Sequence, residues 1–237
     1  MKLKNLIVPA ALIWAGSSLY MAEKYFPLSE KRKTDKPVLL CLGDSITFGA
    51  GVKPTRKKDC WVYILKERLK DEYEVLNYGI SGSTLLKQGD MPYMPFFYKR
   101  ALKQNPEVFI LMLGTNDSKP QNWNREEYER QLKEFIDELK KLPSLKKLYL
   151  CVPPWAYPLK EGEEIAFRIV NDVIEKQIRP YILDHEEEFG VSVIDLYEET
   201  VNRKEYFDDG VHPNIEGNHH IADVIYDRIR KDIEDGK

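Results

Sequence analysis

Three residues of the chain carry the side chains that convert a hydroxyl group into a nucleophile: Ser45, Asp209 and His212. A serine hydroxyl attacks a carbonyl carbon poorly until a base removes its proton, and histidine suits this task near neutral pH. Asp209 precedes His212 by three residues on a glycine-containing turn, so its carboxylate can hold the second imidazole nitrogen. The set predicts nucleophilic catalysis, with Ser45 as nucleophile, His212 as general base and Asp209 as the orienting acid.

Four short polar segments lie where expected strands end or where an expected helix begins. Together they contain Ser45, Asp209 and His212. They are 43–47 (GDSIT), 79–83 (GISGS), 114–117 (GTND) and 208–214 (DDGVHPN). The first three each follow an apolar run that is typical of a buried strand. Because the carboxyl ends of parallel strands meet at one edge of a sheet, these three segments are expected to lie together. The fourth precedes the last expected helix and can reach the same edge.

Strands and helices are predicted to alternate along the chain from Pro37 onward. Short apolar runs predict strands at 38–42, 73–77, 108–113, 147–152 and 191–196. Helical spacing of apolar residues predicts helices at 60–71, 126–141, 165–188 with a bend at Pro180, and 215–233. Such alternation requires right-handed crossovers and a parallel sheet covered on both faces. The predicted fold class is therefore α/β, a three-layer α/β/α sandwich with a five-stranded parallel sheet.

The four polar segments resemble, in the same order, the sequence blocks of the SGNH (GDSL-type) hydrolase superfamily. The resemblance extends from Pro37 to the end of the chain and implies a flavodoxin-like SGNH hydrolase fold. It also implies a serine esterase that works through an acyl-serine intermediate on Ser45. By the same resemblance, the oxyanion hole consists of the Ser45 and Gly82 backbone N–H groups and the Asn116 side chain. Such donors stabilise the charge that develops on the carbonyl oxygen, and a glycine lets the backbone approach a ligand closely.

Each of these residues also has a structural role that it could fill on its own. Ser45 could cap the helix that follows it, and Asn116 and Asp117 could be turn residues. Asp208 is an alternative partner for His212. The presence of all four segments in order favours the catalytic interpretation. The chain lacks the Gly-X-Ser-X-Gly motif of α/β-hydrolases, which argues against that fold and not against an esterase.

The segments 85–90 and 118–123 resemble the carbohydrate O-acetylesterase branch of the superfamily. This resemblance implies an ester of a small molecule or oligosaccharide, with O-acetyl groups on carbohydrate as substrate. The loops between the polar segments are short and polar, which favours a small acyl group such as acetyl. The substrate-rim candidates are Trp123, Tyr93 and Trp155, because an aromatic ring can cover the apolar face of a sugar. Packing within the loops is the alternative for each ring.

Two other functions remain open from the sequence. A lysophospholipase or thioesterase of broader acyl range would keep the same residues and prefer longer acyl chains. A non-catalytic glycan-binding module on the same fold would not need the serine, histidine and aspartate together. A flavodoxin-like protein that binds a flavin phosphate would need a loop rich in Ser, Thr and Gly after the first strand, and 43–51 contains too few of them.

The composition is that of an ordinary globular protein, with 237 residues, 43% hydrophobic and 32% charged. The net charge of −3 and the lack of a basic tract predict no nucleic-acid partner. The histidines and the three cysteines lack the spacing of metal ligands, so we expect no metal and no cofactor. Cys41 and Cys151 are expected to be small apolar residues of the core. The sequence does not determine the oligomeric state.

The first 22 residues differ from the rest of the chain. Lys2 and Lys4 precede an apolar run from Leu6 to Ala22, which is the pattern of a signal peptide or an N-terminal membrane anchor. A spanning helix needs about 20 apolar residues, so the run is marginal in length. We expect residues 23–36 to be a linker and 37–237 to be the SGNH hydrolase domain. The protein is therefore predicted to be exported (secreted, periplasmic or at the cell surface), with an N-terminal helix packed on the domain as the alternative.

Overall fold

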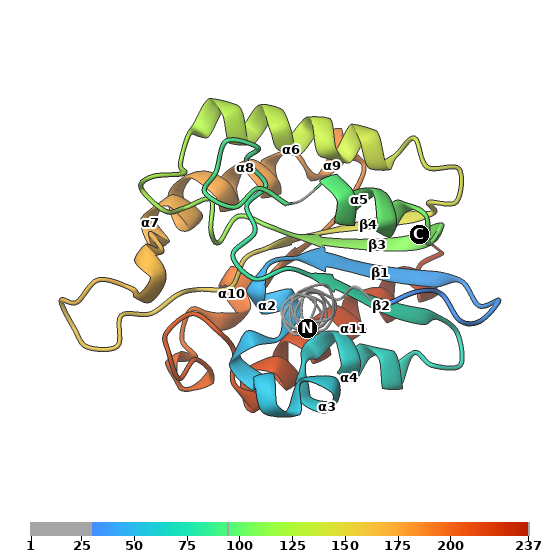
Figure 1. The fold of residues 1–237 in the computed structure, drawn as a ribbon, viewed down its shortest axis with the longest axis horizontal. Coiled ribbons are helices and arrows are strands. Elements are labelled where there is room, and N and C mark those ends of the chain that lie inside the picture. Colours follow the sequence, from blue (N-terminus) through green and yellow to red (C-terminus); the bar gives the residue numbers. More distant parts are fainter. Residues whose placement is uncertain (1–29, 94, 237) are drawn as a thin grey trace, which may run out of the picture.

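A parallel sheet of five strands in the order β2-β1-β3-β4-β5 forms the middle layer of the fold (Figure 1). The strands are β1 (Val38–Gly43), β2 (Glu74–Gly79), β3 (Pro106–Met112), β4 (Lys147–Val152) and β5 (Ser192–Asp195). Every residue of β1 and β2 is buried, as expected for strands covered on both faces. This strand order is that of flavodoxin-like folds, and the predicted three-layer sandwich is confirmed.

The computed structural model describes residues 30–93 and 95–236. The predicted export segment 1–22 and the first part of the predicted linker lie outside these residues. Residues 30–36 run beside the edge strand β2, where the backbone N–H groups of Lys33 and Thr34 donate to the Glu74 carboxylate at 2.8 and 2.7 Å. Within the described ranges, no helix combines the length and the apolar character needed to cross a membrane.

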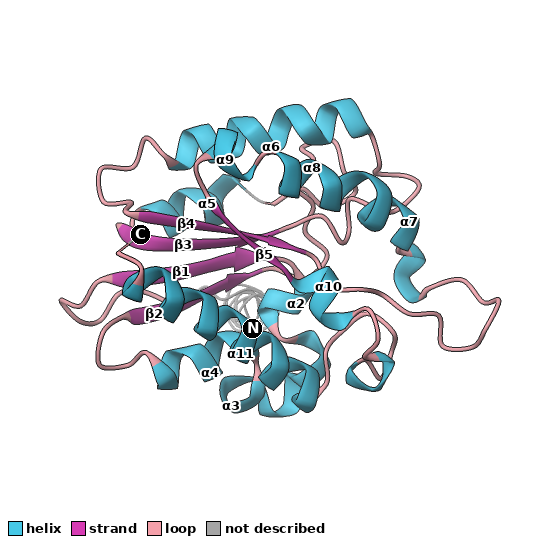
Figure 2. Ribbon diagram, turned by 180° about the vertical axis from the view of Figure 1, so that it is seen from behind, coloured by secondary structure: helices cyan, strands magenta, loops and turns pink. Residues whose placement is uncertain are grey.

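Helices cover both faces of the sheet (Figure 2). One face carries α5 (Pro95–Leu102), α6 (Arg125–Leu139) and α8 (Arg179–Asp184), and the other carries α4 (Trp61–Arg68) and α11 (Ile215–Glu234). Alternate residues of each strand enter the two cores, so that in β1 Leu40 and Leu42 face one core while Leu39 and Cys41 face the other. Each fully buried side chain of this kind stabilises the fold by about 1.5–3 kcal/mol.

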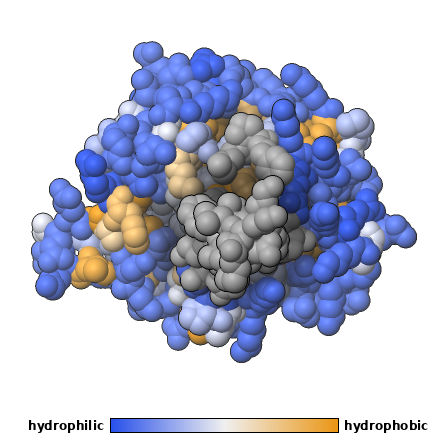
Figure 3. Space-filling model, in the orientation of Figure 1, coloured by the Kyte–Doolittle hydropathy of each residue, from blue (hydrophilic) through white to orange (hydrophobic). Residues whose placement is uncertain are grey.

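Short helices surround the edge of the sheet at which the strands end. They are α2 (Ser45–Phe48), η1 (Ala50–Thr55), α3 (Arg56–Asp59), η2 (Ala166–Arg168), α7 (Asn171–Val173), η3 (Ile174–Ile178), α10 (Leu196–Thr200) and η4 (Lys204–Tyr206). Another short helix, α9 (Glu186–Phe189), leads into the start of β5 at the opposite edge. The long loop between β4 and α7 projects from the same edge (Figure 1). The surface in this view is mostly hydrophilic, with hydrophobic residues in small groups (Figure 3). The large hydrophobic side chains exposed among the described residues are Leu159, Phe167, Leu183, Ile215 and Ile233.

The prediction of one helix over 165–188 is wrong in its start and in its continuity. Phe167 and Arg168 have φ angles of +59° and +62°, which a right-handed helix does not allow, so the helical region begins at Asn171. A π-helical segment precedes Pro180, whose ring has no N–H to donate to the carbonyl four residues earlier. A second break at His185 separates α8 from α9.

The strand order creates the crevice in which a ligand would bind. The chain leaves β1 toward α4 on one face, and it leaves the neighbouring β3 toward α6 on the other face, so the two connections diverge. Gly43 pairs with Gly79 of β2 and with Met112 of β3. The first three polar segments therefore emerge level with one another at the carboxyl edge of the sheet.

Gly79 allows β2 to end directly against the backbone of α2. A Cβ atom on residue 79 would lie 2.2 Å from the Phe48 nitrogen and 2.6 Å from the Thr47 carbonyl carbon. We therefore expect Gly79→Ala to lower the free energy of unfolding by about 1–3 kcal/mol in urea denaturation. Gly162→Ala is the control, because its Cβ would meet nothing within 4 Å and only its left-handed φ of +81° opposes the change. Equal losses in the two variants would contradict the close packing.

Candidate active site

Ser45 is the first residue of α2 and follows β1 by one residue. The helix is capped by Asp44, whose Oδ1 accepts a hydrogen bond from the Ile46 N–H at 2.9 Å. It ends after one turn at Gly49, which has a left-handed φ of +90°. The capping role that the sequence left open for Ser45 therefore belongs to Asp44. The Ser45 side chain is buried, and its hydroxyl, which does not cap the helix, can form a hydrogen bond with another residue.

His212 is that partner. Its Nε2 lies 2.9 Å from the Ser45 Oγ, and its Nδ1 lies 2.6 Å from the Asp209 Oδ2. The second Asp209 oxygen, Oδ1, accepts hydrogen bonds from the backbone N–H groups of Val211 and His212 at 2.9 and 2.7 Å. One carboxylate thus fixes both the backbone and the ring of the histidine. The structure brings together the three residues that the sequence singled out as nucleophile, base and acid.

Partial burial of Asp209 acts to raise its pKa, but the hydrogen bonds from the His212 ring and from two backbone N–H groups outweigh it. The pKa of Asp209 is lowered to about 2. Asp209 is therefore ionised throughout the pH range in which a histidine can be neutral. A fixed negative charge at this position stabilises the imidazolium that forms when the ring takes a proton.

The loop that carries His212 is held by asparagines of α11. Asn214 caps this helix, and its Nδ2 donates to the Asp208 Oδ1 at 2.9 Å, so Asp208 has a structural partner of its own. The buried Asn218 donates from Nδ2 to the Pro213 carbonyl at 2.7 Å and accepts from the Trp61 N–H at 3.0 Å. The loop after His212 is thereby connected to α4. Nothing in the sequence distinguished Asn218 from an ordinary helical residue, since its partners are distant in the chain.

Asn116 connects the first three polar segments. Its Nδ2 donates to the Ser83 carbonyl at 3.1 Å and lies 3.5 Å from the Asp44 Oδ2. The amide group is therefore next to the residue that precedes Ser45, and its side chain is almost completely buried. Gly82 has a φ of +84°, and a Cβ there would lie 2.9 Å from the Met91 sulfur. The left-handed φ therefore favours glycine at this position, whereas the flexible Met91 side chain could move to make room.

Asp117 holds the loop that follows Gly82. Its two carboxylate oxygens accept hydrogen bonds from the backbone N–H groups of Leu85 and Leu86, at 3.0 and 2.8 Å. Burial raises the pKa of Asp117 to about 7 and that of Asp44 to about 6, and the charge of Asp44 adds to the rise at Asp117. Neither side chain is free for chemistry, because both are fully buried and bonded to backbone groups.

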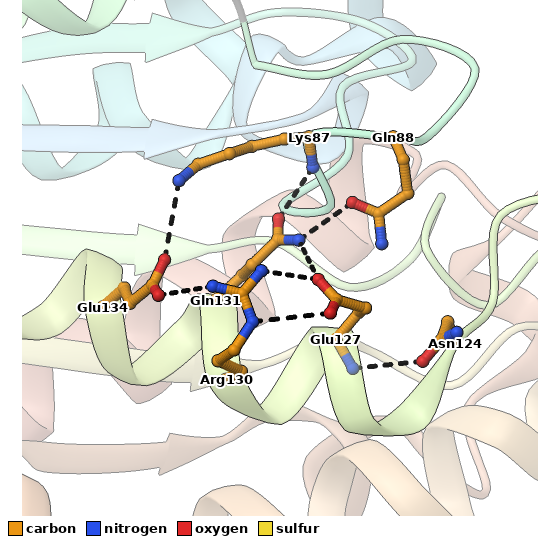
Figure 4. A network of polar contacts seen from close by, with 7 residues as sticks. All are labelled: Lys87, Gln88, Asn124, Glu127, Arg130, Gln131 and Glu134. Carbon is orange, nitrogen blue, oxygen red and sulfur yellow. Dashed lines mark hydrogen bonds and ion pairs between the residues drawn. The ribbon is translucent and has the colours of Figure 1, made fainter.

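The same loop is attached to α6 by the buried side chain of Gln131 (Figure 4). Its Oε1 accepts from the Lys87 N–H, and its Nε2 donates to the Gln88 Oε1 and to the Glu127 Oε2, each at 2.8 Å. An ion pair between Lys87 and Glu134 lies beside these bonds. The role of Gln131 could not be predicted from the sequence, because a glutamine on an amphipathic helix is ordinarily exposed to solvent.

The aromatic rim candidates are packed into the protein, in contrast to the expectation of rings free to stack. Tyr93 is 9% exposed, belongs to the core, and donates its hydroxyl to a main-chain carbonyl at 2.6 Å. Its ring turns inward because the backbone of the loop pairs back on Thr84. Trp123 packs 5.3 Å from the Tyr128 ring, and Trp155 packs 4.7 Å from the Tyr197 ring. The structure therefore places Tyr93 in the core and leaves the two tryptophans partly buried against it.

The exposed ring beside the site is Phe167, which sequence reasoning missed. Phe167 is 56% exposed, and its ring centroid lies 5.0 Å from that of His212, with the planes at 69°. The sequence placed this residue in a long helix, where a phenylalanine is an ordinary apolar position. Only the break of that helix into the loop between β4 and α7 brings the ring to the histidine.

Residues 39–225 match the family of proteins described as GDSL-like lipase/acylhydrolase. The match covers most of the chain and includes all four polar segments, so the chain belongs to this family. The predicted superfamily is confirmed by this membership.

Two relatives of known name are similar over most of the chain. An acetylxylan esterase of Xylanibacter ruminicola is 34% identical over 218 residues, which make up 84% of this chain and 44% of that protein. The chain thus spans less than half the length of this relative. Thioesterase 1/protease 1/lysophospholipase L1 of Escherichia coli K12 is 26% identical over 194 residues, which make up 81% of this chain and 83% of that protein.

Solved structures share the fold at low sequence identity. The acetyl xylan esterase AlAXEase matches with a TM-score of 0.64 and 23% identity, over 81% of this chain and 98% of that one. Est24, a carbohydrate acetylesterase from Sinorhizobium meliloti, matches with a TM-score of 0.66 and 20% identity, over 83% of this chain and 99% of that one. These matches establish the fold of the described residues.

The raised pKa of Asp44 predicts a stability that depends on pH. Its folded pKa of about 6 lies above the ordinary value of 3.8, so between these pH values the folded state binds more protons than the unfolded state. The contribution of Asp44 to stability is therefore full below about pH 4 and is lost as the pH rises through about 6. Asp44→Asn keeps an oxygen to cap α2 and removes the titration.

Thermal unfolding measures this effect. We expect the Tm of Asp44→Asn, relative to that of the natural protein, to rise between about pH 4.5 and about pH 7.5. A difference in Tm that stays constant over this range would contradict the raised pKa.

Proposed function

We propose that the protein is a serine esterase that removes short acyl groups, above all acetyl, from the hydroxyl groups of carbohydrates. The observation that carries the proposal is the continuous line of contacts from Asp209 through His212 to Ser45, at 2.6 and 2.9 Å. The similarity to an acetylxylan esterase over 84% of the chain supports the acetyl group and the carbohydrate. The loop between β4 and α7 is longer than the short loops predicted between the polar segments, so the small acyl group rests on this similarity.

In the acylation half of this mechanism, the Ser45 Oγ attacks the ester carbonyl while His212 Nε2 takes its proton. The carbonyl oxygen becomes an oxyanion, which would be bound by the Ser45 and Gly82 backbone N–H groups and by the Asn116 amide. The Ser45 N–H lies in the first turn of α2, where backbone donors have no acceptor within the helix. The tetrahedral intermediate collapses as His212 donates its proton to the leaving sugar oxygen. The products of this half are a free sugar hydroxyl and acetyl-Ser45.

Deacylation uses the same groups in reverse order. His212 takes a proton from water, which attacks the acetyl carbonyl, and a second oxyanion forms in the same place. Collapse of this intermediate releases acetate and returns the proton to Ser45. Asp209, ionised because of its lowered pKa, stabilises the imidazolium in both halves.

Asn116 has the geometry of a prepared donor. One N–H of its amide is bound to the Ser83 carbonyl at 3.1 Å, which fixes the plane of the group. The contact of Nδ2 with Asp44 at 3.5 Å is long for a hydrogen bond, so the second N–H is only weakly bound and can donate to an oxyanion. Donors held in place before the reaction begins avoid reorganisation during the reaction.

A second candidate function is a lysophospholipase or thioesterase of broader acyl range. It is favoured by the similarity to the Escherichia coli protein of that name, which extends over 83% of that protein. The two functions share the residues of the site and differ in the acyl chain that they accept. A non-catalytic glycan-binding module is disfavoured by the contact between Ser45 and His212, which binding does not require. Export through residues 1–22 stays a prediction from the sequence.

Ser45→Ala tests the nucleophile and the substrate class together. We expect acetate release from acetylated xylo-oligosaccharides to fall by about a thousandfold or more, because the acyl-serine can no longer form. The natural protein should also prefer p-nitrophenyl acetate to p-nitrophenyl octanoate, as measured by kcat/KM. Rates in Ser45→Ala equal to those of the natural protein would refute the serine mechanism. A serine-dependent rate that rises with chain length would favour the second candidate function.

Asn116→Ala tests the oxyanion hole. We expect kcat to fall by about a hundredfold or more with a smaller change in KM, because the amide contact strengthens only in the transition state. Gln121→Ala is the matched control, since it removes an exposed amide from the neighbouring segment 118–123. Steady-state kinetics with p-nitrophenyl acetate measure both variants. A rise in KM with unchanged kcat would remove Asn116 from the oxyanion hole.

A further inference from the structure

The side of the site on which the sugar lies follows from the chemistry of His212. Its Nε2 must first take the proton of the Ser45 hydroxyl, 2.9 Å away, and then deliver it to the oxygen of the leaving alcohol. The alcohol part of the ester therefore lies on the His212 side of Ser45. The carbonyl oxygen lies instead toward the segment that contains Asn116. Residues beside His212 are thus placed to contact the sugar, not the acyl group.

Phe167 is such a residue. Its side chain is 56% exposed, and its ring forms an edge-to-face pair with His212, with centroids 5.0 Å apart and planes at 69°. More than half of the Phe167 side chain thus faces solvent although the ring touches the imidazole. An exposed apolar ring next to the general base offers a flat surface to a group that approaches the same nitrogen.

The loop of Phe167 is tied to the segment that contains Asn116. The Val170 N–H donates to the Ser118 Oγ at 3.1 Å, and that hydroxyl donates to the Thr115 carbonyl at 2.8 Å. Phe167 and Arg168 both have left-handed backbone conformations, which are unfavourable for residues with side chains and persist only where the surroundings hold them. These hydrogen bonds therefore fix the position of the loop that carries the Phe167 ring.

A pocket of about 350 Å³ adjoins this loop, within the range of small-molecule sites. Its lining includes Arg168, Asn171, Asp172, Glu163 and Glu164 together with Pro120, which follows the segment of Asn116. Charged and amide side chains of these types donate to and accept from hydroxyl groups. Ile165, Ile169 and Val170 also line the pocket, so it offers apolar surface beside its polar groups, as a sugar has a C–H face beside its hydroxyl groups. Phe167 lies in the sequence between these lining residues.

We propose that Phe167 is a specificity residue that binds the sugar unit bearing the ester, with its ring against the C–H face of that unit. The adjoining pocket takes the neighbouring unit through its hydroxyl groups. This inference rests on the proposed function and extends it, because it names the part of the chain that recognises the carbohydrate. Recognition of the alcohol thereby resides in the loop between β4 and α7, apart from the acyl chemistry at the sheet edge.

The test compares two esters that share the acetyl group and differ in the alcohol: an acetylated xylo-oligosaccharide and methyl acetate. Phe167→Ala should lower kcat/KM for the oligosaccharide about tenfold more than it lowers kcat/KM for methyl acetate, mainly through KM. Phe167→Tyr should retain most of the activity, because it keeps the ring. Ile233→Ala is the control for loss of an exposed hydrophobic side chain, at the far end of α11.

Phe167→Gly distinguishes the effect of losing the ring from the effect of changing the backbone conformation. Glycine adopts the φ of +59° without strain, so this variant should keep the Tm of the natural protein and still lose the oligosaccharide preference. Equal losses on both esters would overturn the inference, because the ring would then act on His212. Unchanged kinetics on both would also overturn it. If the natural protein itself releases no acetate from the oligosaccharide while it hydrolyses methyl acetate, the proposed function fails, and this inference fails with it.

Discussion

The contact between the Ser45 hydroxyl and the His212 imidazole is the constraint on which the rest of the structure depends. It joins residues 167 positions apart, and each is placed by a different layer of the fold. Ser45 is set by the end of β1 and by the Asp44 cap of α2. His212 is set by Asp209 on one side and by the bonds of Asn214 and Asn218 to its loop on the other. A hydrogen bond of this kind tolerates errors of only a few tenths of an ångström, so both supports must be rigid.

Rigidity at the sheet edge comes from buried polar side chains that bond to backbone groups. Asp117 fixes two N–H groups of the loop after Gly82, and Gln131 fixes a third from α6. Loops have few backbone partners of their own, and a buried N–H without an acceptor is unfavourable by about 1–3 kcal/mol. The raised pKa values of Asp44 and Asp117 are the consequence of using carboxylates for this purpose in a dry environment. The fold therefore gives up some stability at neutral pH to hold the loops of the site.

The carboxyl edge of the sheet and the loop between β4 and α7 contribute different residues to the site. In the proposed mechanism the edge supplies the groups that act on the ester carbonyl, and these come from segments that directly follow β1, β2 and β3. The loop between β4 and α7 places Phe167 against His212, on the side from which the alcohol would leave in that mechanism. The loop bonds to Ser118 through the Val170 N–H, and to Gly210, between Asp209 and His212, through the Tyr157 N–H. A change at the exposed Phe167 side chain can alter the alcohol that is accepted while these bonds are kept. Membership of the family therefore indicates the type of reaction more closely than it indicates the alcohol part of the ester.

The sequence by itself determined the strands, the order of the polar segments and the residue types of the site. Strands buried on both faces must be continuous apolar runs, so 147–152 was predicted with the bounds of β4, and 38–42 differs from β1 by one residue. It did not determine that Tyr93 turns inward, that Asp44 and not Ser45 caps α2, or that the helix expected from 165 begins at Asn171. Nor did it indicate Gln131, Asn218 or Phe167. The reason is that strand and block signals are local in the chain, whereas these positions are decided by partners that only the folded chain brings near.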